Sequence, residues 1–428
     1  MKKIGSRRNW LKKTAVLSTG LCLGTYDTLK AKSIYVNKNS KPKALVAGAG
    51  IMGCWTAYFL HQKGFEVSIC DPFGAGNPRA SSGGETRLIR HMYGEDTLYF
   101  DMAKRSMELW RNTGKTLGKA LYKNTGLLIF SEKETYEYAE KSRALYKQAG
   151  LQLEKISIEA LSETYPFIAS NDLDHAILDT QAGYLLAADS CNTIVDHLLS
   201  KGVKWVASAA KPGDYKKGEL QSVVLSDGSI VKADRYIFAN GPWMAETFPD
   251  LLKGKLRVTR QPVFFFGGPA GFAAKLDKPF PVWMNRDAEN KERCYGVFDT
   301  YKNSFKLAYT QLNETIIDPT SSSRTTTAQE VEHARYLMEK RFPFMREAPL
   351  LYTKVCQHTD TLDKHFILGK HSEVENLWLL GGGSGHAFKH GPALGEQMAN
   401  AVEGSSIPEP RFSVYRLGRI EKFSKKHK

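Results

Sequence analysis

The chain has 428 residues, 42% hydrophobic and 25% charged, so it is long enough for two packed domains and ordinary in composition for a globular protein. Its formal net charge of +15 is concentrated at the ends, because residues 1–40 carry +8 and residues 420–428 carry +3, which leaves +4 for the rest. No basic stripe with interleaved aromatic residues follows between them, which argues against nucleic-acid binding.

Residues 1–33 are typical of an export signal rather than of folded structure. The start is basic, the pair Arg7 and Arg8 follows Ser6, and a mildly apolar run extends from residue 14 to residue 26. This pattern predicts a twin-arginine signal, and therefore a periplasmic protein that folds and takes up any cofactor before export. The apolar run is too short to span a membrane, so stable membrane insertion is not expected. A basic N-terminus on a cytoplasmic protein is the alternative.

Residues 44–71 predict a dinucleotide-binding unit, with an apolar strand, a glycine loop, a helix that ends near Gly64 and a second strand that ends at Asp71. The loop has the spacing G-x-G-x-x-G, whose glycines allow a tight turn, a close approach to a pyrophosphate and close helix packing, in that order. The helix N-terminus offers free N–H groups to phosphates, and Asp71 is placed to accept ribose hydroxyl groups. A glycine-rich turn in another parallel α/β protein is the alternative. The expected cofactor contacts are Gly48, Gly50, Ile51, Met52, Gly53 and Asp71.

Two later segments, residues 233–243 and 376–399, repeat an apolar strand followed by a glycine turn, and the second continues as a helix. A simple NAD-binding unit needs no second segment from near the C-terminus, whereas an extended FAD needs contacts along its ribityl chain and at its ring. The fold class expected is α/β, a Rossmann-like FAD-binding domain with a discontinuous antiparallel-sheet substrate domain. The predicted pieces of the FAD-binding domain are 42–122, 180–258 and 360–412. Those of the substrate domain are 123–179 and 259–359, and a basic tail covers 413–428.

Cys356 stands in the stretch TKVCQHTD, with no second cysteine within sixty positions. The residues alone leave open a buried strand residue, half of a disulfide, a metal ligand, a nucleophile or an attachment point. A metal site would need partners at ligand spacing, and Cys191, Cys294 and Cys356 are too widely separated for one. No metal is therefore expected.

Four blocks of the sequence resemble the family of monomeric sarcosine oxidase and N-methyltryptophan oxidase, within the D-amino-acid oxidase superfamily. They are SSGGETRLIRHMYGE (81–95), CYGVFDTYKNSFKLAY (294–309), KVCQHTDTLDKHFILG (354–369) and GGGSGHAFKHGPALGE (381–396). The resemblance runs from about residue 42 to residue 412 and implies FAD-dependent oxidation of an amine. In that family the cysteine at the position of Cys356 forms a thioether to the 8α-methyl group of the flavin, so the resemblance implies a covalent FAD.

The resemblance also implies roles for four cationic residues. Arg87 would lie against the flavin ring, and Arg90 would hold the substrate carboxylate together with Lys389. From the residues alone, Arg87 and Arg90 would face the same side of a helical or turn backbone, with a surface salt-bridge pair as the alternative. Lys306 matches a lysine that faces the flavin and promotes its reaction with oxygen by stabilising superoxide. A solvated strand lysine is the alternative.

Three positions depart from the family pattern. Gly83 and Thr310 stand where the family usually has histidine, and His358 stands where it usually has tyrosine. These changes imply that the reaction class is kept and that the substrate is not sarcosine. Tyr295 matches an aromatic wall of the pocket, with a core residue as the alternative. His358 would help to deprotonate Cys356 if both side chains share one face of a strand.

The expected enzyme oxidises the C–N bond of an amino acid or N-alkyl amino acid to an imine and reduces oxygen to hydrogen peroxide. A dehydrogenase of the same fold with another electron acceptor, and an exported flavin-binding protein without turnover, remain as alternatives. We expect a monomer. The expected catalytic residues are Lys306, Arg87 and Tyr295, and the expected substrate contacts are Arg90, Lys389 and His358. Further expected FAD contacts are Thr86, Arg87, Cys356, Gly383, Gly385, His386 and Lys389.

Overall fold

The computed structural model describes residues 41–131, 137–276, 278–286, 293–299, 302–310 and 316–418. The predicted export signal and most of the predicted basic tail lie outside the described residues. Within the described residues, no helix is both long and apolar enough to cross a membrane.

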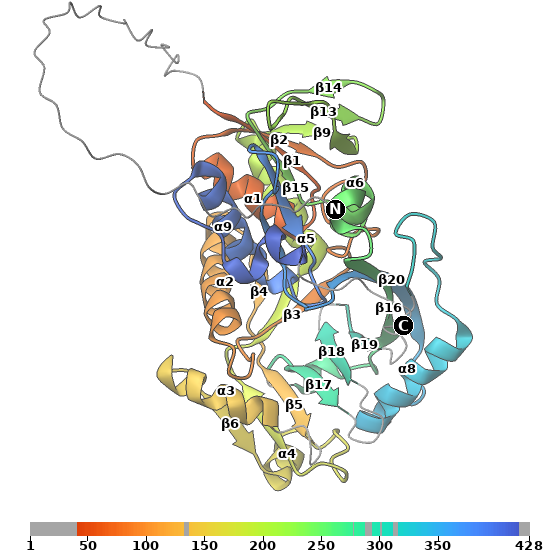
Figure 1. Ribbon diagram of the computed structural model, residues 1–428. Coiled ribbons are helices and arrows are strands. Elements are labelled where there is room, and N and C mark those ends of the chain that lie inside the picture. The colour runs from red at the N-terminus through yellow and green to blue at the C-terminus, as the bar shows by residue number, and fades with distance from the viewer. Residues whose placement is uncertain are drawn as a thin grey trace, which may run out of the picture. The chain divides into compact units, whose positions relative to one another are not determined.

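A six-stranded sheet carries the glycine loop (Figure 1). Its strands, in spatial order, are β21 (Ile367–Lys370), β22 (Leu377–Gly381), β15 (Arg235–Phe238), β1 (Lys43–Ala47), β2 (Glu66–Cys70) and β9 (Lys204–Val206). Neighbours are parallel except β21 and β22, which are antiparallel. The three strands predicted to precede glycine turns are thus adjacent, as β1, β15 and β22. The second predicted strand ends at Cys70, one residue before Asp71.

Four long helices pack against the core of this sheet. They are α1 (Ile51–Gln62), α2 (Thr97–Thr116), α5 (Ala187–Ser200) and α9 (Gly391–Glu403). Trp55 of α1 is fully buried and meets the ring of Trp110 of α2 edge to face, with 5.1 Å between ring centroids. Helices α1 and α9 approach so closely that a Cβ atom on Gly395 would lie 2.6 Å from the backbone of Trp55. The first and last long helices are therefore packed backbone to backbone.

An eight-stranded sheet lies below the first one in Figure 1. Its order is β20 (Leu350–Thr361), β16 (Leu256–Gly267), β19 (Ser304–Tyr309), β18 (Arg293–Asp299), β17 (Val282–Arg286), β5 (Leu127–Ser131), β7 (His175–Asp179) and β6 (Leu153–Ile156). The predicted antiparallel pairing holds except between β17 and β5, which are parallel. Helix α8 (Ala328–Arg341) buries Ala334, Leu337 and Met338 in the core of this sheet. Thr327 and Glu330 form a capping box at its start.

The remaining elements are short or peripheral. A three-stranded antiparallel sheet joins β3 (Thr86–Ile89), β8 (Gly183–Leu186) and β4 (Tyr122–Lys123). Two small sheets hold β10 (Ala210–Pro212), β13 (Val223–Leu225) and β14 (Ile230–Val231), and β11 (Tyr215–Lys216) with β12 (Glu219–Leu220). The other helices are α3 (Glu137–Gln148), α4 (Ile158–Thr164), α6 (Met244–Thr247) and α7 (Pro249–Leu252). The 3-10 turns are η1 (Gly241–Trp243), η2 (Ala273–Lys275), η3 (Pro343–Met345), η4 (Phe388–His390), η5 (Pro410–Phe412) and η6 (Val414–Gly418).

Candidate functional site

A cavity of about 650 Å³ is lined by residues of both large sheets. The six-stranded sheet contributes the carboxyl ends of its parallel strands, at Ala47, Cys70, Ala239 and Gly381. The eight-stranded sheet contributes residues of β16, β18, β19 and β20. In open α/β sheets, ligands bind outside the carboxyl ends of the strands, so this position is where a bound cofactor is expected.

The glycine loop has the geometry that its spacing predicts. Gly48 has a φ of +105°, and a Cβ atom there would lie 2.4 Å from the carbonyl oxygen of Ala239. A Cβ atom on Gly53 would lie 1.9 Å from the carbonyl oxygen of Gly48. At the start of α1, the N–H of Ile51 donates to Oγ of Ser82 at 2.9 Å. Both glycines are thus sterically required, and Ser82 covers one N–H group that the sequence left for a phosphate.

Asp71 lines the cavity directly after β2. Its carboxylate accepts hydrogen bonds from the N–H groups of Ala49, at 2.9 Å, and Phe73, at 2.8 Å. Burial raises the pKa of this carboxyl group, and the backbone N–H groups oppose that shift. An ionised carboxylate has about four acceptor positions, and the backbone N–H groups of Ala49, Phe73 and Gly74 leave room for a ribose hydroxyl group.

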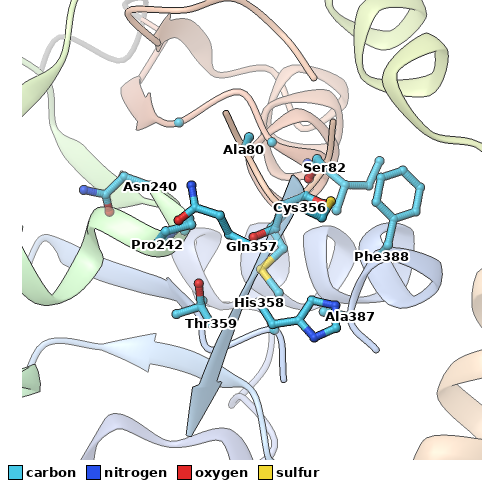
Figure 2. A pocket seen from close by; sticks show the side chains of 18 of the residues that line it. Ala80, Ser82, Asn240, Pro242, Cys356, Gln357, His358, Thr359, Ala387 and Phe388 are labelled. Carbon is cyan, nitrogen blue, oxygen red and sulfur yellow. Dashed lines mark hydrogen bonds between the residues drawn. The ribbon is translucent and has the colours of Figure 1, made fainter. Parts of the chain in front are cut away.

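Cys356 lies on β20 and faces the cavity (Figure 2). Its sulfur accepts a hydrogen bond from Nη2 of Arg87 at 3.1 Å. The same guanidinium group donates to the carbonyl oxygens of Ser81, at 2.7 Å, Gly83, at 2.6 Å, and Thr86, at 2.8 Å. A fixed cation beside a partly exposed sulfur is the setting in which cysteines act as nucleophiles.

Arg87 and Arg90 do not have the helical or turn backbone that their spacing suggested. Arg87 is in strand β3, and Arg90 follows the strand. Both nevertheless line the cavity, because β3 ends at its wall. The salt-bridge alternative is wrong for Arg87, whose partners are backbone carbonyls and a sulfur atom.

His358 follows Cys356 by two positions on β20, so both side chains point to the same face of the strand and line the cavity. Figure 2 shows the ring of His358, and the glycine-rich loop that follows β22 packs against it. A Cβ atom on Gly385 would lie 3.2 Å from the His358 ring, so the loop packs tightly against it. Burial lowers the pKa of His358 to about 4, which leaves a neutral imidazole at the cavity wall.

Arg90 and Lys389 bring two cationic groups to one part of the cavity wall. The Arg90 guanidinium lies 5.1 Å from the ring centroid of Tyr93 and the Lys389 ammonium 5.3 Å from it. Nζ of Lys389 donates to the hydroxyl group of Tyr93 and to the carbonyl oxygen of His386, both at 2.9 Å. Burial, followed by the charge of Arg90, lowers the pKa of Lys389 well below its ordinary value. Two such groups side by side form a site for an anion.

Lys306 is buried in β19 and does not line the main cavity. Its Nζ donates to the carbonyl oxygen of Thr86 at 2.8 Å and to Oγ1 of Thr86 at 3.2 Å. It lies 5.3 Å from the ring centroid of Tyr295, which does line the cavity. Burial, and next the charge of Arg87, lowers the pKa of Lys306 to about 7. The solvated alternative is therefore wrong for this lysine, and Tyr295 is a cavity residue rather than core.

Most of the predicted site residues meet at this cavity. The cavity-lining residues among them are Gly48, Gly50, Ile51, Met52, Asp71, Arg87, Arg90, Tyr295, Cys356, His358, Gly383, Gly385, His386 and Lys389. The other predicted residues, Gly53, Thr86 and Lys306, do not line the cavity. Cavity residues that the sequence analysis did not assign include Ser82, Asn240, Pro242, Gln261 and Gln357. The turn after β15 was a signal for Asn240 and Pro242, whereas nothing in the spacing indicated Gln261 or Gln357.

Gly83 is closely packed against the backbone of the preceding loop. A Cβ atom there would lie 2.5 Å from the carbonyl oxygen of Asn77 and 2.9 Å from Cα of Pro78. A histidine therefore does not fit without a backbone shift. Thr310 and His358, the other two departures, both line the cavity.

The described cysteines form no disulfide. Cys54, Cys70, Cys191 and Cys294 are buried and free, and Cys356 is free and partly exposed. Over the same part of the chain, no group of three or more histidine, cysteine and acidic side chains is placed to hold a metal ion.

Comparison with known proteins gives a consistent result. A family model described as FAD dependent oxidoreductase (DAO) matches residues 43–401. Monomeric sarcosine oxidase of Bacillus sp. (strain B-0618) is 27% identical over 382 residues, which cover 88% of this chain and 95% of the relative. N-methyl-L-tryptophan oxidase of Yersinia pestis (strain Pestoides F) is 24% identical over 383 residues, 88% of this chain and 98% of the relative. The crystal structure of L-proline dehydrogenase from P. horikoshii has a similar fold, with a TM-score of 0.77 and 20% identity over 89% of this chain and 98% of that one.

Proposed function

Because the chain belongs to the DAO family of FAD dependent oxidoreductases, we propose that it oxidises the C–N bond of an amino acid or N-alkyl amino acid to an imine and passes the electrons to oxygen. The observation that carries this proposal is the pair Arg90 and Lys389, which line the same cavity as the glycine loop and Cys356. A carboxylate is the substrate group that an arginine and an adjacent lysine select.

The residues of the cavity fit FAD. A volume of about 650 Å³ falls within the range of about 300–1,000 Å³ that is usual for cofactor sites. The strand ends, the glycine loop and Asp71 form one continuous lining with Cys356 and the loop that follows β22. Bound there, FAD would supply the acceptor for a hydride from the substrate carbon, and the protein would supply binding, orientation and charge.

The substrate is oriented by charge and by one neutral ring. Arg90 and Lys389 hold its carboxylate with hydrogen bonds worth about 1.5–3 kcal/mol each. His358 borders the same cavity with a neutral imidazole, which accepts a hydrogen bond from the substrate amino group. The substrate carbon loses a hydride only after the nitrogen has lost a proton, and the imine that results is hydrolysed by water.

Oxygen is reduced near Lys306. The buried ammonium group is fixed by the two oxygen atoms of Thr86 and lies behind the wall that Tyr295 forms. A fixed positive charge there stabilises superoxide as it forms. One further electron and two protons then convert superoxide to hydrogen peroxide.

We also propose that Cys356 is covalently linked to FAD. Cys356 would hold FAD through a thioether to its 8α-methyl group, and Arg87 would keep the sulfur in place through its hydrogen bond. Forming that bond would release two protons and two electrons in total, which oxygen would take up as hydrogen peroxide. After acid precipitation, the yellow chromophore should remain with the wild-type polypeptide and should be released from Cys356→Ser. Release of all flavin from the wild type would contradict the linkage.

Export to the periplasm is a further part of the proposal. It is supported by the paired Arg7 and Arg8 in the basic N-terminal segment. Its test is described in the Discussion.

The proposed reaction is tested by an anaerobic screen. The purified holoprotein is mixed without oxygen with a panel of amino acids, their N-methyl derivatives and matching amines that lack a carboxylate. We expect bleaching of the flavin absorption by a carboxylate-bearing amine, and hydrogen peroxide after oxygen is admitted. Bleaching by simple amines alone would contradict the carboxylate site, and no bleaching by any amine would favour a flavin-binding protein without turnover. Reduction followed by slow reaction with oxygen would favour a dehydrogenase.

A further inference from the structure

The hydroxyl group of Tyr93 joins three nitrogen atoms near the cavity. It lies 2.7 Å from Nε2 of His390, 2.9 Å from Nζ of Lys389 and 3.1 Å from Nδ1 of His386. A phenol has one hydrogen to donate and accepts up to two hydrogen bonds, so the three contacts fill its capacity. Each of the three partners therefore has a defined donor or acceptor role.

Those roles follow from the carbonyl oxygen of Lys364, which lies 3.2 Å from Nε2 of His386. A carbonyl oxygen only accepts, so Nε2 of a neutral His386 carries the hydrogen and Nδ1 accepts one. Tyr93 then donates to His386, and both His390 and Lys389 donate to the oxygen of Tyr93. Lys389 cannot use its own lone pair in this network.

The second partner of Lys389 leads to the same conclusion. The carbonyl oxygen of His386, 2.9 Å from Nζ, also accepts only. Within the described chain, Nζ of Lys389 thus donates two hydrogen bonds, one to the hydroxyl group of Tyr93 and one to the carbonyl oxygen of His386. A neutral amine has two hydrogens, so these acceptors satisfy it fully, and its fourth tetrahedral position is left for a ligand. Lys389 lines the cavity, so that position is open to a bound substrate.

The surroundings of Lys389 favour the neutral amine while the cavity holds no anion. Lys389 is 6% exposed, and among the described groups burial and the charge of Arg90 act against its ammonium form. The other titratable groups near this cluster are Tyr93 from the loop before α2, Tyr99 from α2, Tyr138 from α3, and His386 and His390 from its own segment. The carboxyl groups of Asp96 and Asp179 act on Tyr93 and Arg90, respectively, but among the described groups Arg90 is the charge that acts on Lys389 itself.

We propose that Lys389 is the general base that removes the proton from the amino group of the substrate. This assignment rests on the proposed oxidation of an amino acid. An amino acid enters as a zwitterion, its N–H bond breaks, and one N–H bond forms at Nζ of Lys389. No electron moves in this step. The lysine, now an ammonium group, donates to the carboxylate beside it, and the substrate nitrogen keeps the lone pair that hydride loss requires. Tyr93 is the positioning residue, because its hydroxyl oxygen accepts one of the two N–H groups of Lys389.

The charge state of Lys389 can be tested without turnover, with acetate as the probe. Acetate has a carboxylate and no proton to give, so its binding to the wild-type holoprotein should take up about one proton per site at neutral pH. Titration calorimetry in buffers of different ionisation enthalpy measures this uptake. Lys389→Arg keeps the charge, because a guanidinium does not lose its proton, and should bind acetate without uptake. Acetate binding to the wild type without proton uptake, or no binding at all, would overturn the assignment.

The base itself is tested with an amino acid that reduces the flavin. Lys389→Arg should bind that substrate but reduce the flavin about 100-fold more slowly at neutral pH, in line with the usual contribution of a general base. The rate should recover as the pH rises and the substrate amine loses its proton to solvent. Equal rates for Lys389→Arg and the wild type at neutral pH would show that lysine serves only as a cation. If no amino acid reduces the flavin of any variant, the proposed function fails, and the acetate result alone still decides the charge state.

Discussion

Replacing Lys306 with methionine tests whether this buried cation drives the reaction with oxygen. Nζ lies 5.3 Å from the ring centroid of Tyr295 at the cavity wall, so a superoxide ion formed there would be about as far from the charge. At an effective dielectric constant of about 20, two unit charges at this distance attract by about 3 kcal/mol. Since each 1.36 kcal/mol changes a rate about tenfold, we expect Lys306→Met to react with oxygen about 200-fold more slowly.

The effect should depend on pH in a direction that the structure fixes. The pKa of Lys306 is lowered to about 7, so the ammonium form is present below that pH and is lost above it. Negative charge on a reduced flavin would raise this pKa, which places the midpoint at or above pH 7. Reoxidation of the wild type should therefore slow as the pH rises through this region. The methionine variant should be slow at every pH.

The assay is stopped-flow mixing of anaerobically reduced holoprotein with oxygen over a range of pH. Lys302→Met is the matched control, because Lys302 is an exposed lysine in the turn just before β19, the strand that carries Lys306. It should react as the wild type does. A rate for Lys306→Met within threefold of the wild type at acidic pH would refute the charge argument and would favour a dehydrogenase.

The lowered pKa of Lys306 also predicts how the stability of the protein depends on pH. The unfolded chain holds the proton of this lysine up to a pKa of 10.5, whereas the folded protein loses it near pH 7. Between these values the unfolded state binds more protons, so the free energy of unfolding rises with pH, by at most about 1.4 kcal/mol per pH unit from this one group. Urea titrations should show that Lys306→Met lacks this part of the slope.

Three further substitutions test the cavity and the proposed export of the protein. Arg90→Ala should weaken binding of a carboxylate-bearing substrate by about tenfold or more and leave a carboxylate-free amine unaffected, as measured by flavin titration. Gly53→Ala should prevent retention of FAD, because its Cβ atom would lie 1.9 Å from the carbonyl oxygen of Gly48, and a variant that keeps its flavin would contradict this packing. Replacing Arg7 and Arg8 with lysine should leave the protein in the cytoplasm, as fractionation would show, and unchanged periplasmic recovery would remove the export proposal.

The sequence predicted what depends on neighbouring residues. The unit from β1 to β2 follows from its apolar runs and from glycines that the backbone requires, as at Gly48. The shared face of Cys356 and His358 follows from the period of a strand. These local rules also located the turns after β15 and β22.

The contacts between distant segments could not be read in the same way. Lys389 meets Tyr93 across 296 positions, and Lys306 meets Thr86 across 220, so no spacing rule connects them. Arg87 and Arg90 were expected on a helical or turn backbone, because residues three positions apart face the same side there. Instead, this segment pairs with β8 and forms a strand. The burial and the arginine neighbours that lower the pKa values of both lysines therefore required the structure.

The packing of α1 against α9 has a consequence for the time at which the protein becomes functional. Ile51 and Trp55 of α1 lie against Gly391 and Gly395, about 340 residues later in the chain. At about 5–20 residues per second, the ribosome takes about 20–70 seconds to cover that distance. Helix α1 is synthesised early, but its packing partner α9 is synthesised last. We therefore expect tight binding of the flavin only when synthesis is nearly complete. A chain truncated before α9 would lack that packing partner. Retention of the cofactor would therefore be limited to chains whose synthesis is nearly complete.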